Sequence, residues 1–313
     1  MVSGDCETGA KIRIAPKGKG GAPHISFHVR ILVQFCQNGR ALGGIHPGIV
    51  IDKVSIIGCS SYFCPKITKH TMCTVTFLPT STGYILTHNR DEAPSRSPQA
   101  IGRADIGADV LLFPRDTKAG GAWIVASKSG KTACLLNGAF VKHHHNPPYL
   151  RSRGLVLLDF FEWRQQVPFV QHYDLEGIEP FTFLLFEKGA VTELRWDGRQ
   201  RHLKNHSPEV PHFWCSATLY PPEMQAKREQ VFRDWLKGPV APMPSAIYRL
   251  HRTGSVGDPE NDFVMNRSGK VCTVSITQVI FKKEIFQMRY FDLLEGHRDI
   301  RRMTARKRHI LIV

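Results

Sequence analysis

The sequence has no stretch of about 18 consecutive apolar residues, the length that a helix needs to cross a bilayer. We therefore expect no membrane-spanning helix. The N-terminal region also lacks a continuous apolar segment, because His28, Arg30 and Gln34 interrupt its most apolar part. A secretory signal peptide is not expected for that reason. Together these absences favour a cytoplasmic protein.

Cysteine pairs at metal-binding spacing are also missing. The eight cysteines are scattered without a CxxC motif, and Cys59 and Cys64 have no second pair to complete a zinc site. In a chain of 313 residues this pattern favours reduced thiols over a disulfide framework. His143, His144 and His145 are consecutive, so their side chains point in different directions and favour an exposed loop. We expect no bound metal.

Acidic residues are scarce relative to basic ones. The chain has 42 Lys and Arg against 27 Asp and Glu, a net charge of +15, which suggests an anionic partner. The segment after Glu295 is basic, but no aromatic residues interleave with its arginines as in a nucleic-acid platform. We expect no nucleic-acid partner; contact of this segment with nucleic acid or phospholipid headgroups is an alternative. The sequence does not indicate an oligomeric state.

A change of composition at Met72 divides the chain. Residues 1–71 begin with a Gly/Lys-rich stretch and show no long periodic segment. Beyond them, strand-like apolar runs alternate with turn residues. We predict an irregular extension over 1–71, a folded domain over 72–295 and a basic C-terminal tail over 296–313.

The 72–295 domain is predicted to be α+β, with more strand than helix. Apolar periodicity predicts a helix over 152–166, and a second helix with Pro222 in its first turn over 221–237. A Pro/Gly-rich loop is expected over 238–262. Alternating apolar segments on either side of turn residues predict three hairpins, formed by 73–78 with 84–88, 122–126 with 131–136, and 271–281 with 285–291.

The first of these hairpins brings a cysteine next to charged residues. If its strands pair symmetrically across the turn at 79–83, Cys73 lies opposite Arg90, with Asn89 and Asp91 on either side. A neighbouring cation favours the thiolate, which is the nucleophilic form of cysteine. Asp91 can hold Arg90 or an amino group in place. The alternative is a solvated loop after the strand and a small, buried, inert Cys73.

Cys73 directly follows Met72. If translation began at Met72 and this methionine were removed, Cys73 would carry an α-amino group, with an ordinary pKa near 8, able to accept the thiol proton. In the printed sequence its nitrogen is instead an amide. Three explanations are open for residues 1–71: an incorrectly assigned upstream extension, which we favour, a propeptide removed before Cys73, or a permanent extension that abolishes this chemistry.

These residues resemble the NRDE family, also called the transport and Golgi organisation family. Members typically begin with Met-Cys and are named for the tetrapeptide that stands here at 89–92. The resemblance covers about 72–291. Three further blocks support it: Ala-Gly-Gly-Ala-Trp at 119–123, Leu-Leu-Asn-Gly at 135–138 and Arg-Ser-Arg-Gly-Leu at 151–155.

The family in turn resembles the N-terminal-nucleophile hydrolases of the bile-salt hydrolase and penicillin-acylase branch. This resemblance implies a four-layered αββα sandwich with mainly antiparallel sheets, and cleavage of a small-molecule acyl amide without a cofactor. It also implies that Cys73 is the nucleophile, with Arg90 and Asp91 beside it. Asn137 is the expected oxyanion-hole residue. The alternative for Asn137 is a turn residue before Gly138.

Asn89, Glu92 and Arg153 are the expected substrate-binding residues. Arg153 lies at a predicted helix start, where it could hold an anionic group or be solvated; Arg228 carries the same ambiguity.

The alternative function, implied by eukaryotic relatives, is a non-catalytic haem- or lipid-binding or trafficking protein. Haem would need an axial ligand, and Cys73 and His88 are the candidates.

Overall fold

The computed structural model describes residues 72–97, 100–107, 109–163, 166–187, 189–239, 241 and 243–306. Contacts divide the chain into the units Met1–Cys59 and Ser60–Val313, and every described residue belongs to the second. The extension predicted over 1–71 therefore lies outside the described residues.

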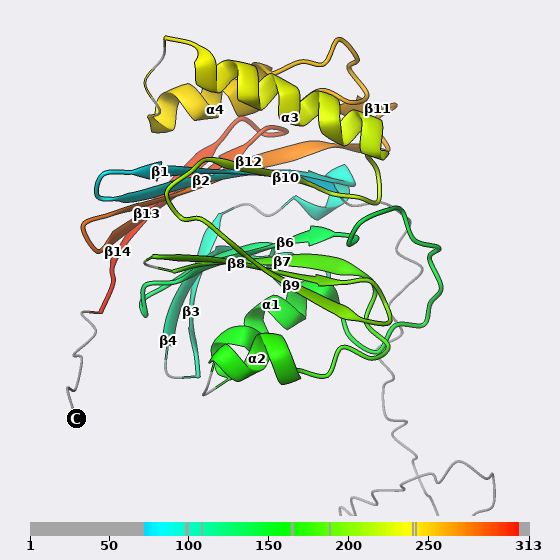
Figure 1. The fold of residues 1–313 in the computed structure, drawn as a ribbon, viewed down its shortest axis with the longest axis vertical. Coiled ribbons are helices and arrows are strands. Elements are labelled where there is room, and N and C mark those ends of the chain that lie inside the picture. Colours follow the sequence, from blue (N-terminus) through cyan, green and yellow to red (C-terminus); the bar gives the residue numbers. More distant parts are fainter. Residues whose placement is uncertain are drawn as a thin grey trace, which may run out of the picture. The chain divides into compact units, whose positions relative to one another are not determined.

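Two sheets of seven strands each form the centre of this unit (Figure 1). In the first, here called sheet A, the strand order is β10-β1-β2-β12-β13-β14, and β11 pairs with β12. Its strands are β1 (Met72–Thr80), β2 (Gly83–Glu92), β10 (His212–Cys215), β11 (Asn266–Arg267), β12 (Val271–Lys282), β13 (Ile285–Asp292) and β14 (Arg298–Thr304).

Sheet B is the second sheet, and its strand order follows the sequence from β3 to β9. Its strands are β3 (Ile101–Ile106), β4 (Asp109–Pro114), β5 (Ile124–Ser127), β6 (Thr132–Asn137), β7 (Phe181–Glu187), β8 (Ala190–Trp196) and β9 (Arg201–His206). All pairings between neighbouring strands in both sheets are antiparallel.

Helices cover the outer side of each sheet, which gives four layers in the order αββα (Figure 1). Helices α1 (Arg153–Glu162) and α2 (Gln166–His172) pack on sheet B, and α3 (Pro222–Lys237) and α4 (Pro244–Thr253) pack on sheet A. A single 3-10 turn, η1 (Pro94–Arg96), follows β2. The α+β class and the four-layered antiparallel sandwich are thus confirmed. No described helix is long and apolar enough to cross a membrane.

Apolar side chains fill each of the three spaces between the layers. Between the two sheets, alternate residues of β1 and β2 such as Val75 and Leu86 meet Ile124 and Leu136 from sheet B, all almost inaccessible to solvent. This alternation is the two-residue period of a strand. Burying one such side chain stabilises the fold by about 1.5 to 3 kcal/mol. A polar side chain in this apolar layer is therefore an exception.

The first hairpin has the register that the sequence predicts. Cys73 pairs with Arg90, and Pro79 pairs with Tyr84 across the turn. β2 also pairs with β12 on its other edge, so the hairpin lies in the middle of sheet A. Gly83 is required at the turn, because a Cβ there would lie 2.0 Å from the carbonyl oxygen of Phe281.

Three sequence-based expectations need correction. The helix expected over 152–166 ends at Glu162. The loop expected over 238–262 contains α4, which begins with a proline and buries Ile247 and Leu250 on one side. The predicted tail over 296–313 contains β14, so its first part belongs to sheet A. The Pro/Gly content of 238–262 and the charge of 296–313 suggested irregular structure. Tertiary packing nevertheless stabilises a helix in the first segment and a strand in the second.

Candidate functional site

Cys73 is the second residue of β1, and its side chain faces the space between the sheets, with 5% exposure. Burial raises the pKa of the thiol far above its ordinary value, and the nearby Asp91 and Glu92 carboxylates raise it further. Arg90 acts in the opposite direction, but its effect is smaller. Arg90 thus favours the thiolate as expected, but burial outweighs this effect for Cys73 within a continuous chain.

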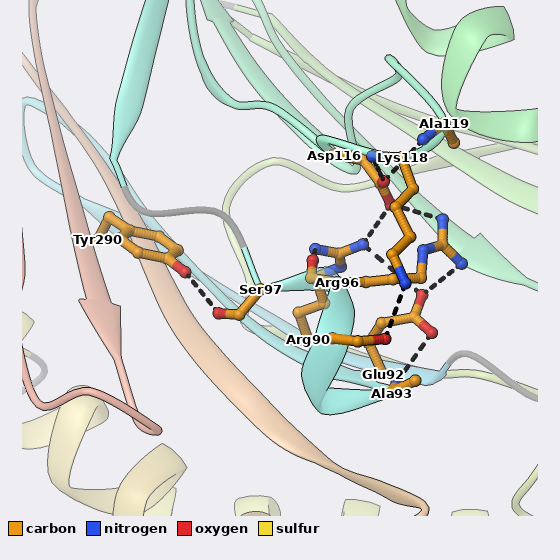
Figure 2. A network of polar contacts seen from close by, with 10 residues as sticks. Arg90, Glu92, Ala93, Arg96, Ser97, Asp116, Lys118, Ala119 and Tyr290 are labelled. Carbon is orange, nitrogen blue, oxygen red and sulfur yellow. Dashed lines mark hydrogen bonds and ion pairs between the residues drawn. The ribbon is translucent and has the colours of Figure 1, made fainter.

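Arg90 is buried and held on several sides (Figure 2). One Nη donates to Oδ2 of Asp116 at 2.6 Å, and the other donates to the carbonyl oxygen of Arg96 at 2.8 Å. Its Cζ lies 3.9 Å from the ring centroid of Trp123, which is a cation–π contact. This guanidinium is consequently a fixed positive charge in the strand position opposite Cys73.

Glu92 belongs to the same charge network rather than to an open binding site (Figure 2). Its Oε2 lies 2.8 Å from Nη1 of Arg96, and its Oε1 accepts the backbone N–H of Ala93. Arg96 also contacts Asp116 at 2.5 Å. The carboxylates of Glu92 and Asp116 and the guanidiniums of Arg90 and Arg96 thus form one cluster of alternating charges. Glu92 is 2% exposed. Its predicted role in contacting substrate is not supported by this geometry.

Asn89 and Asp91 face the opposite side of sheet A, toward the helices. The Asn89 amide donates to the carbonyl oxygens of His251 and Phe263, and its Oδ1 lies 2.6 Å from Nδ1 of His251. Because consecutive side chains of a strand point to opposite faces, they cannot share the face of Cys73 and Arg90. The predicted substrate-binding role of Asn89 therefore has no support from its position, because its amide is hydrogen-bonded on the helix side of the sheet.

Asp91 lies in a buried polar cluster behind the sheet. Thr273 and Tyr220 donate hydroxyl hydrogen bonds to its two oxygens, at 2.5 and 3.3 Å. Burial nevertheless raises the pKa of Asp91 to about 6, although Arg228 opposes this shift. The Arg228 side chain is fully buried and donates to Oγ1 of Thr74 at 2.6 Å. Arg228 is therefore neither solvated nor free to hold a substrate.

Asn137 is connected to Cys73 through a single residue, Ser216. The backbone N–H of Ser216 donates to the carbonyl oxygen of Cys73 at 2.9 Å, and its hydroxyl donates to the carbonyl oxygen of Asn137 at 2.5 Å. Asn137 ends β6 of sheet B, whereas Cys73 begins β1 of sheet A. Ser216 thus links the two sheets beside the candidate nucleophile. Sequence reasoning missed it, because no local motif marks it.

Arg153, His143 and His145 meet at the carboxylate of Glu179. Nη2 of Arg153 lies 3.0 Å from Oε2 of Glu179, while His143 and His145 lie 3.0 and 3.2 Å from its Oε1. These hydrogen bonds and the Arg153 charge lower the pKa of Glu179 to about 2 despite its burial. Arg153 is therefore ion-paired rather than solvated. Burial lowers the pKa of Arg153, and the negative charge of Glu179 opposes this shift.

Two of the sequence blocks contact each other through glycines. A Cβ at Gly121 would lie 2.6 Å from the carbonyl carbon of Gly154, and the N–H of Ala122 donates to the Gly154 carbonyl oxygen at 3.0 Å. Gly121 precedes Trp123, which lies under Arg90, and Gly154 adjoins Arg153. The close glycine contact therefore joins the start of α1 to the Arg90 network.

Comparison with known proteins agrees with these blocks. A profile of the family described as Transport and Golgi organisation 2 matches residues 72–237, more than half of the chain. The chain belongs to this family. No curated protein matches the sequence. The matched residues include Cys73, Arg90, Asn137 and Arg153 of the candidate site.

Solved structures similar to this family member include two hydrolases. Penicillin V acylase from Agrobacterium tumefaciens has 9% identity and a TM-score of 0.45, with 73% of this chain and 85% of that one covered. A variant of conjugated bile acid hydrolase from Clostridium perfringens has 10% identity and a TM-score of 0.43, covering 76% of this chain and 100% of that one.

The haem interpretation of the family does not fit these side chains. His88 is completely buried between the sheets, and burial lowers the pKa of its imidazole to about 3. Cys73 is almost as inaccessible, and neither residue lines the nearby groove formed by residues 217–219, Val141, Lys142 and Arg267. An axial ligand must face a space that holds the porphyrin. Among the described residues no group of three or more His, Cys, Asp or Glu is arranged to hold a metal ion.

A groove of about 460 Å³ adjoins the Ser216 link. Residues 217–219, which directly follow Ser216, line one side, and Val141 and Lys142, which follow Asn137 closely in sequence, line another. Arg267 also contributes to the lining, and no acidic side chain does. The groove therefore offers apolar surface and two positive charges next to the candidate site.

Proposed function

We propose that this family member is a hydrolase that cleaves an amide bond of a small molecule, with Cys73 as nucleophile after release of its α-amino group. The observation that carries the proposal is the Ser216 link, with Arg90 in the opposite strand position. It brings the thiol-bearing residue, the residue with a side-chain amide and a fixed cation to one end of the space between the sheets.

The free amino group is essential to this chemistry. Within a continuous chain the nitrogen of Cys73 is an amide that cannot accept the thiol proton, and burial holds the thiol neutral. An α-amino group on the same residue accepts the thiol proton, and the resulting ammonium adds a second positive charge near sulfur. Arg90 then reinforces an effect that it is too weak to produce alone.

The reaction consists of two acyl transfers. Sγ of Cys73 attacks the amide carbon, the Asn137 side-chain amide stabilises the oxyanion, and the leaving amine departs with the proton taken from the thiol. Water then attacks the thioester, a proton returns to sulfur, and the acid is released. The groove holds the body of the substrate, and its cations Lys142 and Arg267 favour a substrate with an anionic group.

Intact-mass measurement of the protein from its native host tests the first requirement. A mass that corresponds to a chain beginning at Cys73 supports the proposal, and hydrolysis of acyl amides is then measured with the Cys73→Ala variant as the blank. Cys134→Ala is the matched control, since Cys134 is also a buried free thiol facing the other sheet. Equal loss in both variants contradicts a specific nucleophile at Cys73.

A non-catalytic role is the second candidate, and the 5% exposure and raised pKa of the Cys73 thiol favour it. A native mass that retains Thr71 and Met72 supports this candidate, because Cys73 then has no α-amino group. Amide hydrolysis that persists in that longer chain and disappears in Cys73→Ala would argue against both descriptions.

A further inference from the structure

The helix-facing side of β13 and β14 carries three arginines close together. Arg289 lies opposite Ile300, and Arg298 and Arg302 lie two residues before and after Ile300 in the neighbouring strand. Residues two apart in a strand share a face, so the three guanidiniums surround Ile300. With Phe291, which lies opposite Arg298, these residues are here called the arginine face.

The helices leave this face largely open. Phe291 contacts Tyr248 of α4, with ring centroids 4.3 Å apart, which fixes the face on the helix side of sheet A. Met303, on the other side of β14, packs against the core between the sheets. Arg298 and Arg302 are exposed, and Ile300 is 44% exposed. The face is thus accessible at the end of the sheet beyond α4.

No described acidic residue forms an ion pair with Arg289, Arg298 or Arg302. The Nε of Arg289 donates only to the neutral Gln287, at 2.8 Å. Partial burial and the charges of the other two arginines lower the pKa of Arg289. The one ion pair of β14 involves Arg301, which points to the opposite side. The three positive charges therefore repel one another, and an anion placed over them would relieve the repulsion.

Exposed aliphatic side chains accompany these charges. Ile300, Ile285 and Leu294 are 44%, 47% and 42% exposed, and all three belong to β13, β14 or their connection. Aliphatic groups among arginines suit the headgroup region of a bilayer, where the former enter the interface and the latter bind phosphates. Single-stranded nucleic acid would instead need free aromatic rings, and Phe291 is packed against Tyr248.

We propose that the arginine face docks the protein on a membrane surface that contains anionic phospholipids. The net charge of +15 supports approach to such a surface, and the three arginines with Ile300 form the contact. The face consists of residues from two hydrogen-bonded strands at one edge of sheet A. This role does not depend on the chemistry of Cys73.

Flotation of the full chain with lipid vesicles tests the proposal. One preparation contains phosphatidylcholine alone, and the other an equimolar mixture with phosphatidylserine. The variant Arg298→Gln with Arg302→Gln removes two charges, and at roughly fivefold per arginine we expect its affinity to fall about 25-fold. The matched control is Arg199→Gln with Lys204→Gln, which removes two exposed charges near β9. Ile300→Asn tests the aliphatic contact.

The proposal predicts binding to the anionic vesicles only, loss of binding in the arginine variant, weaker binding in Ile300→Asn, and unchanged binding in the control. Equal flotation with both vesicle types, or no flotation with either, overturns it. Equal losses in the arginine variant and the control show attraction by net charge alone, which also overturns it. Thermal unfolding of each variant distinguishes a lost surface from a lost fold.

Discussion

Gly121 and Gly154 touch at a separation that leaves no room for a side chain on Gly121. A Cβ on Gly121 would lie 2.6 Å from the carbonyl carbon of Gly154, a backbone atom that cannot rotate away. We predict that Gly121→Ala lowers the free energy of unfolding by about 3 kcal/mol, the upper end for an overpacked core. Urea unfolding measures this. Gly102→Ala is the control, since its Cβ would meet only an ordinary contact at 3.4 Å; equal effects would contradict the prediction.

Arg90 neutralises a buried acidic site, so its loss should be severe. In Arg90→Met the Asp116 and Glu92 carboxylates keep their backbone hydrogen bonds but only Arg96 as a positively charged partner. Breaking a buried ion pair typically costs about 3 to 5 kcal/mol, and we expect destabilisation of this size. Arg233→Met is the control, because its exposed helical pair with Glu229 should contribute less than about 0.5 kcal/mol. Similar unfolding curves for both variants would refute the prediction.

Asp91 should make stability depend on pH in an unusual direction. Its pKa is raised from 3.8 to about 6, so the folded state holds the proton to higher pH than the unfolded chain. The stability that this proton contributes is complete below about pH 4 and is lost as the pH rises through about 6. Between these limits the free energy of unfolding of Asp91→Asn should rise by up to about 3 kcal/mol relative to that of the unchanged protein. A constant difference across this range would contradict the prediction.

Removing the Ser216 hydroxyl should loosen the link between the sheets. We predict that Ser216→Ala lowers the free energy of unfolding by about 1 to 2 kcal/mol, since the hydrogen bond from Ser216 to the buried Asn137 carbonyl is lost. Thr192→Ala removes an exposed hydrogen bond to Asn205 and should change stability far less. If Cys73 is catalytic, amide hydrolysis by Ser216→Ala should fall in kcat more than KM rises. Unchanged stability and kcat would remove Ser216 from the site.

Glu179 should control the segment that contains the triple histidine. Glu179→Gln removes the negative charge that holds Arg153, His143 and His145, so amide hydrogen exchange over 143–151 should accelerate. Asp197→Asn, which weakens an exposed pair with His202, is the control and should leave this segment unchanged. Hydrogen-exchange mass spectrometry measures both, and equal protection in the two variants would contradict the prediction.

The sequence predicts local pairing better than side-chain direction or distant contacts. The register of Cys73 with Arg90 follows from a short turn between two alternating strands. The four residues of the tetrapeptide at 89–92 are all expected at the site, but consecutive strand residues alternate between the two faces, so only Arg90 and Glu92 share the side of Cys73. Ser216 carries no motif, and only the fold brings it to Cys73 and Asn137. Likewise, the sequence leaves open whether Arg228 is solvated or holds an anion, and only the fold shows that it donates to Thr74 and lies near Asp91.

The position of Cys73 near the start of β1 makes the fold tolerant of a new chain terminus there. Met72 is the one described residue that precedes it, and in the sheet Met72 pairs only with Asp91. Pairing with β10 begins later, at Thr74. A chain trimmed to begin at Cys73 would therefore keep every other strand pair of the sandwich. The sheet would be the same whether that terminus arose by proteolytic cleavage or by translation that begins at Met72.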